Sequence, residues 1–85
     1  MSADVRPGQI WADNDWRSAG RTLRVIRVDD THATCVVVTN DRRTQALVHA
    51  GQRAFDRRGK ETRILLRRFR PNSTGYELLG NEVAS

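Results

Sequence analysis

The sequence predicts a mainly β protein in which five short strands curl into a small closed barrel. At 85 residues, the chain has room for one domain only, taken as 1–85. Short apolar, β-branched runs alternate with turn-forming Gly, Pro, Asn and Asp, as in small all-β domains. In the second run, the alternation slips between Val25 and Ile26, as a bulge or sharp bend requires. Such bends let a short sheet close, and closure protects its edges.

The first three strands follow from these runs. Residues 9–12, after Pro7-Gly8, predict the first strand, and 13–20 are rich enough in turn residues to predict a loop. Residues 22–28 predict the second strand, followed by a tight turn at 29–32. Residues 33–39 are β-branched almost throughout, which predicts a third strand covered on both faces.

The segment 40–59 allows three interpretations. Asn40 or Asp41 can cap a two-turn helix over 43–50 that stops at Gly51. The same residues also suit a long hairpin extension or a mobile loop, since so short a helix is marginal without packing. The sequence leaves this long variable loop between the third and fourth strands open.

The last two strands complete the layout. Residues 62–66 predict a strand with Thr62, Ile64 and Leu66 on one face and Arg63, Leu65 and Arg67 on the other. The stretch 68–71 ends it, 72–75 form a turn, and 76–79 predict a short fifth strand. Frayed tails are expected at 1–6 and 80–85. Five strands with a variable loop before the fourth are typical of an SH3-like barrel.

The net charge of +5 is unevenly distributed along the chain. Residues 1–41 carry −1, residues 42–70 carry +8, and residues 71–85 carry −2. Fourteen of the 15 basic residues are arginine, whose planar fork suits phosphate contacts and base stacking. A GC-rich genome produces the same preference for arginine, but it does not explain the clustering. The block at 42–70 therefore indicates an electrostatic footprint for an anionic polymer.

A basic cluster is the predicted nucleic-acid-binding surface. It consists of Arg57, Arg58, Lys60, Arg63, Arg67, Arg68 and Arg70. On one strand, Arg63 and Arg67 would share a face about 13 Å apart, so the cluster can form one contiguous patch. The alternative is a solvated face, partly neutralised by the aspartates at positions 13, 15, 29 and 30.

The two tryptophans have two interpretations each. Trp16 lies in a polar loop beside arginine and is the predicted stacking residue for unpaired bases, which bind aromatic rings by about 1–3 kcal/mol each. Trp11 shares a strand face with Gln9 and Asp13. The alternative is that each tryptophan caps an open end of the barrel. Phe69 and Tyr76 are assigned to the core.

Catalytic and metal-binding patterns are not expected. Asp13-x-Asp15 lacks the remaining ligands of a calcium loop, and His32 and His49 lie too far apart in the sequence to match a metal-ligand motif. The single cysteine, Cys35, lies inside an apolar strand, where a thiol is inert and packs in the core. We therefore expect no catalytic residue, no metal, no cofactor and no enzyme activity. No membrane segment or signal peptide is visible, which favours the cytoplasm of a bacterial host cell.

Two blocks of the chain resemble a known group of proteins. The stretch 5–15 (VRPGQIWADND), with Arg17-Ser18 and 20–25 (GRTLRV), is the first block. Thr62-Arg63-Ile64, 68–71 (RFRP) and 73–76 (STGY) form the second. Together they resemble small uncharacterised proteins of actinobacteria and their bacteriophages. The resemblance implies such an origin and an SH3-like barrel, and it brings no known activity with it.

The start of the chain is also similar to MazF/PemK-type toxin ribonucleases. Those proteins share a Pro/Arg-Gly-x-Ile-Trp strand, a loop with Ser and Gly, and a basic second strand. Their Arg-Pro pair at the second strand is Arg21-Thr22 here. The likeness implies that Arg21 lies near a phosphate, but it supplies no base or nucleophile.

Three functional hypotheses follow. The first is a binding module that holds nucleic acid of unknown type through its arginine-rich surface, with no membrane or small-molecule cofactor involved. The second is a protein-interaction module that docks on a host factor or self-associates as a homodimer, with an exposed Trp11 or Leu65 as the hot spot. The third is a toxin-type ribonuclease.

Overall fold

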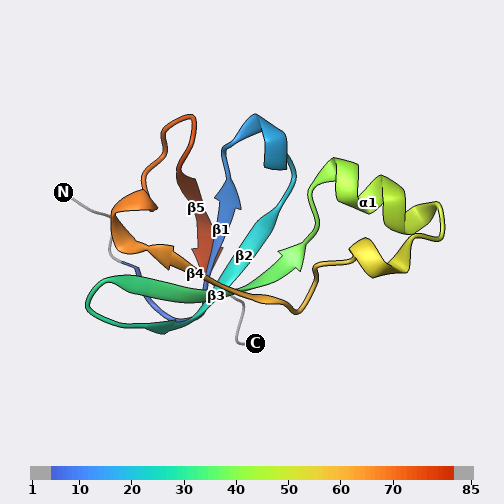
Figure 1. Cartoon of the computed structure of the whole chain (residues 1–85). Coiled ribbons are helices and arrows are strands. Elements are labelled where there is room, and N and C mark those ends of the chain that lie inside the picture. The colour runs from blue at the N-terminus through green and yellow to red at the C-terminus, as the bar shows by residue number, and fades with distance from the viewer. Residues whose placement is uncertain (1–4, 82–85) are drawn as a thin grey trace.

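The structure is a computed structural model that describes residues 5–81. Its centre is one five-stranded antiparallel sheet in the order β4-β3-β2-β1-β5 (Figure 1). The strands are β1 (Gln9–Asp13), β2 (Thr22–Val28), β3 (His32–Thr39), β4 (Glu61–Leu65) and β5 (Tyr76–Asn81). One helix, α1 (Arg42–His49), and three 3₁₀ turns, η1 (Trp16–Ser18), η2 (Arg53–Phe55) and η3 (Leu66–Arg68), occupy the connections. The mainly β prediction is confirmed.

The bend predicted in the second strand is present. The register between β2 and β3 shifts between Val25 and Arg27, and a second shift between Ile10 and Trp11 bends β1 against β5. Each extra residue increases the local twist of its strand. The sheet is therefore coiled and curves around the core side chains.

The prediction that β3 is covered on both faces is correct for only half of the strand. Ala33, Thr34 and Cys35 are all buried, so both faces are covered there. Towards the end of the strand, Val38 is 43 % exposed, and the prediction of two covered faces is wrong. Beyond this point the chain leaves the sheet for α1, and the outer face of Val38 stays partly exposed among the described residues.

The helix interpretation of the long connection is the one that the structure adopts. The Asp41 side chain caps α1 by accepting hydrogen bonds from Thr44 N (2.7 Å) and Thr44 Oγ1 (3.0 Å). Gly51, at φ +95°, reverses the chain after the helix. α1 packs against η2, and residues 41–60 form an arm that projects from the sheet (Figure 1). No residue of α1 is buried.

A buried asparagine joins the arm to the sheet. Asn40 is only 3 % exposed, and its Nδ2 donates to Gln45 Oε1 (3.0 Å) and to Asp56 Oδ1 (2.9 Å). Its Oδ1 accepts a hydrogen bond from Arg57 N (3.0 Å). Because Gln45 belongs to α1 and the other two residues to the returning chain, one side chain ties both halves of the arm together.

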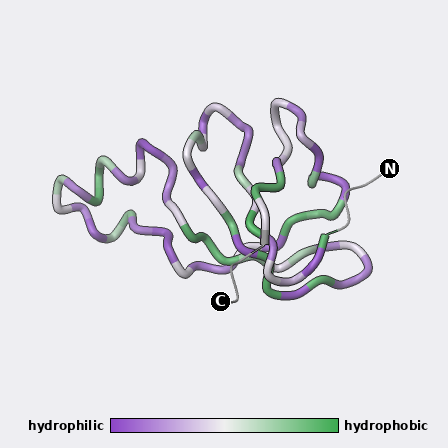
Figure 2. The backbone as a smooth tube through the Cα atoms, turned by 180° about the vertical axis from the view of Figure 1, so that it is seen from behind, coloured by the Kyte–Doolittle hydropathy of each residue, from purple (hydrophilic) through white to green (hydrophobic). Residues whose placement is uncertain are grey.

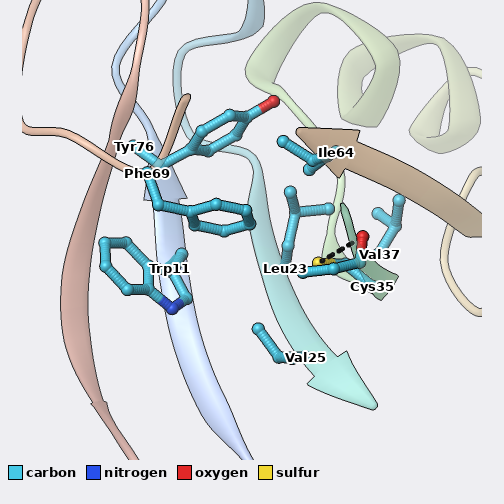
Figure 3. Close-up of a cluster of buried hydrophobic side chains, with 9 residues drawn as sticks. Trp11, Leu23, Val25, Cys35, Val37, Ile64, Phe69 and Tyr76 are labelled. Carbon is cyan, nitrogen blue, oxygen red and sulfur yellow. Dashed lines mark hydrogen bonds between the residues drawn. The ribbon is translucent and has the colours of Figure 1, made fainter. Parts of the chain in front are cut away.

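The core is a cluster of buried side chains to which all five strands contribute, and Figure 2 shows the hydrophobic stretches (green) alternating with hydrophilic ones (purple) along the chain. Its members are Trp11, Leu23, Val25, Ala33, Cys35, Val37, Ile64, Phe69 and Tyr76. Phe69 packs edge-on against Trp11, with ring centroids 5.0 Å apart, and lies 5.4 Å from Tyr76 (Figure 3). The Trp11 indole donates to Gln9 Oε1 at 3.1 Å. The core assignment of Phe69, Tyr76 and Cys35 is confirmed.

The fourth strand is shorter than predicted, and barrel closure is not confirmed. β4 ends at Leu65, and the chain turns into η3, where Leu66 N donates to Thr31 O (2.9 Å). Arg67 is therefore not on the strand face of Arg63. Among residues 5–81, β4 and β5 do not pair. The turn carries Phe69 into the core instead, so a buried ring stands where a closed barrel has a strand pair.

The predicted tails fall partly outside the described residues. Residues 1–4 and 82–85 are not described. Within the described part, Gly80 and Asn81 extend β5 and pair with Ile10 and Gln9 of β1. Val5 is half-buried against the core cluster.

Candidate functional site

Two of the predicted basic residues are neutralised by carboxylates. Arg58 forms an ion pair with Asp56 at 2.6 Å, and Arg63 forms one with Asp29 at 2.9 Å. Asp56 also accepts from Arg58 N, so its turn holds the guanidinium in place. Neither arginine adds much to a positive field, because a carboxylate lies directly beside each one.

A second pair lies where the arm meets the sheet. Arg57 and Lys60 line an open groove of about 440 Å³ together with Arg21. Arg21, however, is engaged on its inner side: its Nη2 lies 2.9 Å from Asp13 Oδ2 and 3.4 Å from the Tyr76 hydroxyl. The side chain of Asp13 is only 5 % exposed. Arg21 therefore has a structural task as the partner of a buried carboxylate.

The remaining three predicted arginines lie together at η3 and the loop after it. Arg67, Arg68 and Arg70 line a small groove of about 200 Å³ with Asn72 and Thr74. Arg68 Nη2 donates to Thr74 O (3.0 Å), and its guanidinium carbon lies 5.7 Å from the centre of the Tyr76 ring. The loop closes on itself because Tyr76 N donates to Arg70 O at 2.8 Å.

The tryptophans differ completely in exposure. Trp11 is 2 % exposed and belongs to the core, so the hypothesis of an exposed Trp11 hot spot is wrong. Leu65, the other candidate, is half-buried. Trp16 is 83 % exposed, so it caps nothing. The turn that carries Trp16 is held by other side chains: Asp15 accepts a hydrogen bond from Arg17 N (3.0 Å) and pairs with the Arg17 guanidinium (2.7 Å).

Trp16 has basic neighbours that the sequence analysis did not identify. It lines a groove of about 460 Å³ with Arg42 and Arg43, the first two residues of α1. The helix start is brought there by a hydrogen bond from Arg42 N to Ala19 O (2.9 Å). The signal was present in the cap at Asp41, which places the next two side chains in the first helical turn. Only the fold places that turn beside Trp16.

These groups form one continuous edge of the molecule. Asn14 N donates to Gly75 O (3.0 Å) and Asn14 Nδ2 donates to Asn72 O (3.1 Å), which joins the loop after β1 to the loop after η3. Together with the Arg42–Ala19 bond, this links three segments that lie along one side of the sheet in Figure 1. We call this edge the rim and define it by Trp16, Arg17, Arg42, Arg43, Arg67, Arg68 and Arg70.

The rim carries a strong local charge. Its six arginines lie near two aspartates, Asp15 and Asp41, which gives a net charge of +4. Asp15 is already paired with Arg17, and Asp41 caps α1. Within residues 5–81, no carboxylate forms an ion pair with Arg42, Arg43, Arg67, Arg68 or Arg70. The guanidinium groups of Arg42, Arg43, Arg67 and Arg70 are therefore available to an anion, and Arg68 keeps the donors that Thr74 O does not occupy.

The hydrogen-bonded aspartates make the free energy of unfolding depend on pH in the acid range. The Arg17 side chain and backbone lower the pKa of Asp15 to about 2, and hydrogen bonds lower the pKa values of Asp29 and Asp56 well below their usual range. Carboxylates with depressed folded-state pKa values stabilise the fold above their unfolded pKa, near about 4, and lose that contribution as the pH falls. We expect the urea midpoint to fall progressively between about pH 4 and pH 2 at constant ionic strength.

The variant Asp29→Asn is the control for this prediction. Its amide oxygen can still accept the hydrogen bonds that Thr31 N and His32 N donate to Asp29 Oδ1, but it does not titrate. It should be less stable than the parent at neutral pH and show a shallower acid dependence. An identical acid profile would exclude Asp29 as a source of the effect.

The single thiol is poorly suited to nucleophilic chemistry. Cys35 is fully buried, and burial raises the pKa of its thiol to about 11. Within residues 5–81, no three His, Cys, Asp or Glu side chains gather as a metal site, and no helix has the length and apolar character to cross a membrane.

Comparison with known proteins identifies one family. No curated protein matches the chain, and neither does any solved structure. A family described as a family of unknown function, DUF6354, matches residues 1–85. Because the match spans the whole chain, the protein belongs to the DUF6354 family.

Proposed function

We propose that the protein is a non-enzymatic nucleic-acid-binding module that contacts phosphates through the rim. One observation supports this most strongly. Five arginines without a carboxylate partner in residues 5–81 lie on two segments, and backbone hydrogen bonds join both segments to the loop that carries Trp16. Arginine binds phosphate with two parallel hydrogen bonds, and release of counterions then supplies most of the affinity. Such contacts position a nucleic acid without reading its sequence, so selectivity is low.

The rim differs from the surface that the sequence analysis selected. It keeps Trp16, Arg67, Arg68 and Arg70, and it adds Arg17, Arg42 and Arg43. Arg58 and Arg63 stay outside it because they are paired with Asp56 and Asp29. Arg57 and Lys60 stay outside it as well, because the groove that they line with Arg21 is also lined by the carboxylates of Asp41 and Glu61.

The test replaces two rim arginines and compares them with two paired ones. In Arg67→Ala/Arg70→Ala, the slope of log K against log salt should fall by about 1.4 to 1.8, because two phosphate contacts are lost at roughly 0.7 to 0.9 each. Affinity at about 50 mM salt should fall about tenfold or more. Binding is measured by fluorescence anisotropy with labelled RNA, single-stranded DNA and duplex DNA over about 50–200 mM salt.

Arg58→Ala/Arg63→Ala is the matched control. It removes the same net charge from the protein, but the carboxylates of Asp56 and Asp29 already cancel much of it locally. A nearly parental slope for this variant supports local contact at the rim. Equal losses in both variants would mean that only net charge matters, and absence of salt-sensitive binding to all three nucleic acids would reject the function.

Self-association is the second candidate, and the edge strand favours it. β5 lies at the edge of the sheet, and its residues Leu78 and Leu79 are 47 % and 56 % exposed. An edge strand with apolar side chains can pair with another chain. Sedimentation that shows a concentration-dependent dimer, and a host partner that survives nuclease treatment in a pull-down, would each favour protein interaction.

We further propose an SH3-like architecture and an actinobacterial or phage origin, with the protein working in the host cytoplasm. The strand order and the register shifts in the β1–β5 and β2–β3 pairings support a coiled sheet of this type, although β4 and β5 do not pair in the described residues. The origin is supported by the resemblance of the blocks around Trp11 and Phe69.

A further inference from the structure

We infer that the rim takes a single-stranded nucleic acid and that one unpaired base stacks on Trp16. This inference rests on the proposed function and adds the class of ligand to it. The indole is 83 % exposed on a protein whose other tryptophan is 2 % exposed. Exposing an aromatic ring of this size to water is unfavourable, and the described residues leave most of the indole uncovered. The flat partner that suits it is a base, because every base has a face that stacks on an aromatic ring.

The position of Trp16 is held by its surroundings. The Asp15 cap and the Arg17–Asp15 ion pair shape the turn before the indole, independently of the ring itself. On one side, Asn14 is bonded to Gly75 and Asn72, and on the other side Ala19 is bonded to Arg42. A platform anchored on both sides loses little conformational entropy when a ligand covers it.

The groove beside the ring has the size and charge for a nucleotide. Its volume of about 460 Å³ lies within the range of about 300–1,000 Å³ seen for sites of small organic molecules. Arg17, Arg42 and Arg43 line it together with Asp41, whose carboxylate is engaged by Thr44 at the start of α1. A base on the indole would thus have guanidinium groups beside its phosphate, which is the combination that single-strand binding proteins use.

A duplex cannot use the indole in this way. Its bases are stacked on one another, and exposing a face requires a nucleotide to be flipped out at a cost. The rim arginines would still contact duplex phosphates. Single strands should therefore bind more tightly than duplexes of equal length, and the difference should depend on Trp16.

The experiment measures the fluorescence anisotropy of a labelled oligothymidylate of about 16 nucleotides, the upper end of known single-strand site sizes, and of a labelled duplex of that length. In the parent protein, quenching of the intrinsic tryptophan fluorescence is recorded as well. Since Trp11 is buried, quenching by the single strand reports on Trp16. Trp16→Ala should weaken single-strand binding by about 5- to 100-fold and leave duplex binding nearly unchanged. Trp16→Tyr should recover much of the loss, because it restores an aromatic face.

Phe55→Ala is the matched control, because Phe55 is an exposed aromatic (47 %) on the arm, away from this groove. It should bind like the parent protein, and thermal unfolding checks that each variant is folded. Salt-sensitive binding that is equal for both ligands and unaffected by Trp16→Ala would overturn this inference while the proposed function stands. Absence of salt-sensitive binding to the oligothymidylate, to the duplex and to a labelled single-stranded RNA would overturn both.

Discussion

Replacing Phe69 with alanine is expected to lower the free energy of unfolding by about 3–5 kcal/mol, which leaves little or nothing of the stability of so small a domain. Phe69 is fully buried and packs against both Trp11 and Tyr76. It fills the space between β4 and β5, which do not pair within the described residues. No strand can move in to fill the cavity, because both edges are held by their other neighbours.

Phe55→Ala provides the same chemical change at an exposed site. Phe55 is 47 % exposed in η2, so its loss should cost about 1 kcal/mol or less. Urea unfolding followed by Trp fluorescence measures both variants, and reaction of the buried Cys35 thiol reports global opening independently. Similar small losses in the two variants would show that Phe69 does not close the sheet.

Replacing Gly75 with alanine is expected to be nearly as destructive, at about 3 kcal/mol or more. A Cβ at this position would lie 2.1 Å from Arg70 O and 3.0 Å from Arg68 O, both backbone atoms. It would also lie 2.6 Å from Asn72 Oδ1. The loop cannot yield easily, because Tyr76 N is bonded to the same Arg70 carbonyl.

Gly59→Ala is the control for Gly75. Gly59 has a φ of +84° and open space where the Cβ would stand, so alanine there meets only backbone strain of about 1–2 kcal/mol. Thermal or urea unfolding of the two variants should therefore separate a steric clash from the loss of a glycine. If Gly75→Ala were no worse than Gly59→Ala, the loop after η3 would have to rearrange freely.

The effect of Gly75 also reaches the rim. Its carbonyl accepts the hydrogen bond from Asn14 N that joins two of the three rim segments. A Gly75 variant that still folds should thus lose affinity for nucleic acid without losing any guanidinium group. For this reason, the contacts themselves are tested by Arg67→Ala/Arg70→Ala, whose side chains are exposed.

The strands were predictable because their signals are local. The β-branched runs and turn residues located β2 at Thr22–Val28, and the slip in alternation located its bulge. The cap and stop residues around α1 were also visible, although a helix this short could not be chosen over a loop. Packing on η2 and the Asn40 hydrogen bonds decided that question, and both are contacts across the connection.

The sequence shows that the protein has an excess of arginine, but it does not show on which surface the unpaired arginines gather. Treating 62–66 as a continuing strand put Arg63 and Arg67 on one face, whereas η3 turns the chain so that Phe69 can reach the core. Arg58 and Arg63 look like free charges in the sequence, and only the fold sets Asp29 beside Arg63. Arg42 and Arg43 reach Trp16 through a backbone bond between distant segments.

The number of strands and their places along the chain, the bend in β2, the burial of Cys35 and the excess of arginine all follow from the sequence alone. Each of these features depends either on residues that are neighbours in the sequence or on the amino-acid composition. The tertiary structure alone decided which tryptophan is buried, which arginines are neutralised and which three segments form the rim. These depend on pairs far apart in the chain, whose Coulomb and packing energies exist only once folding has brought them together.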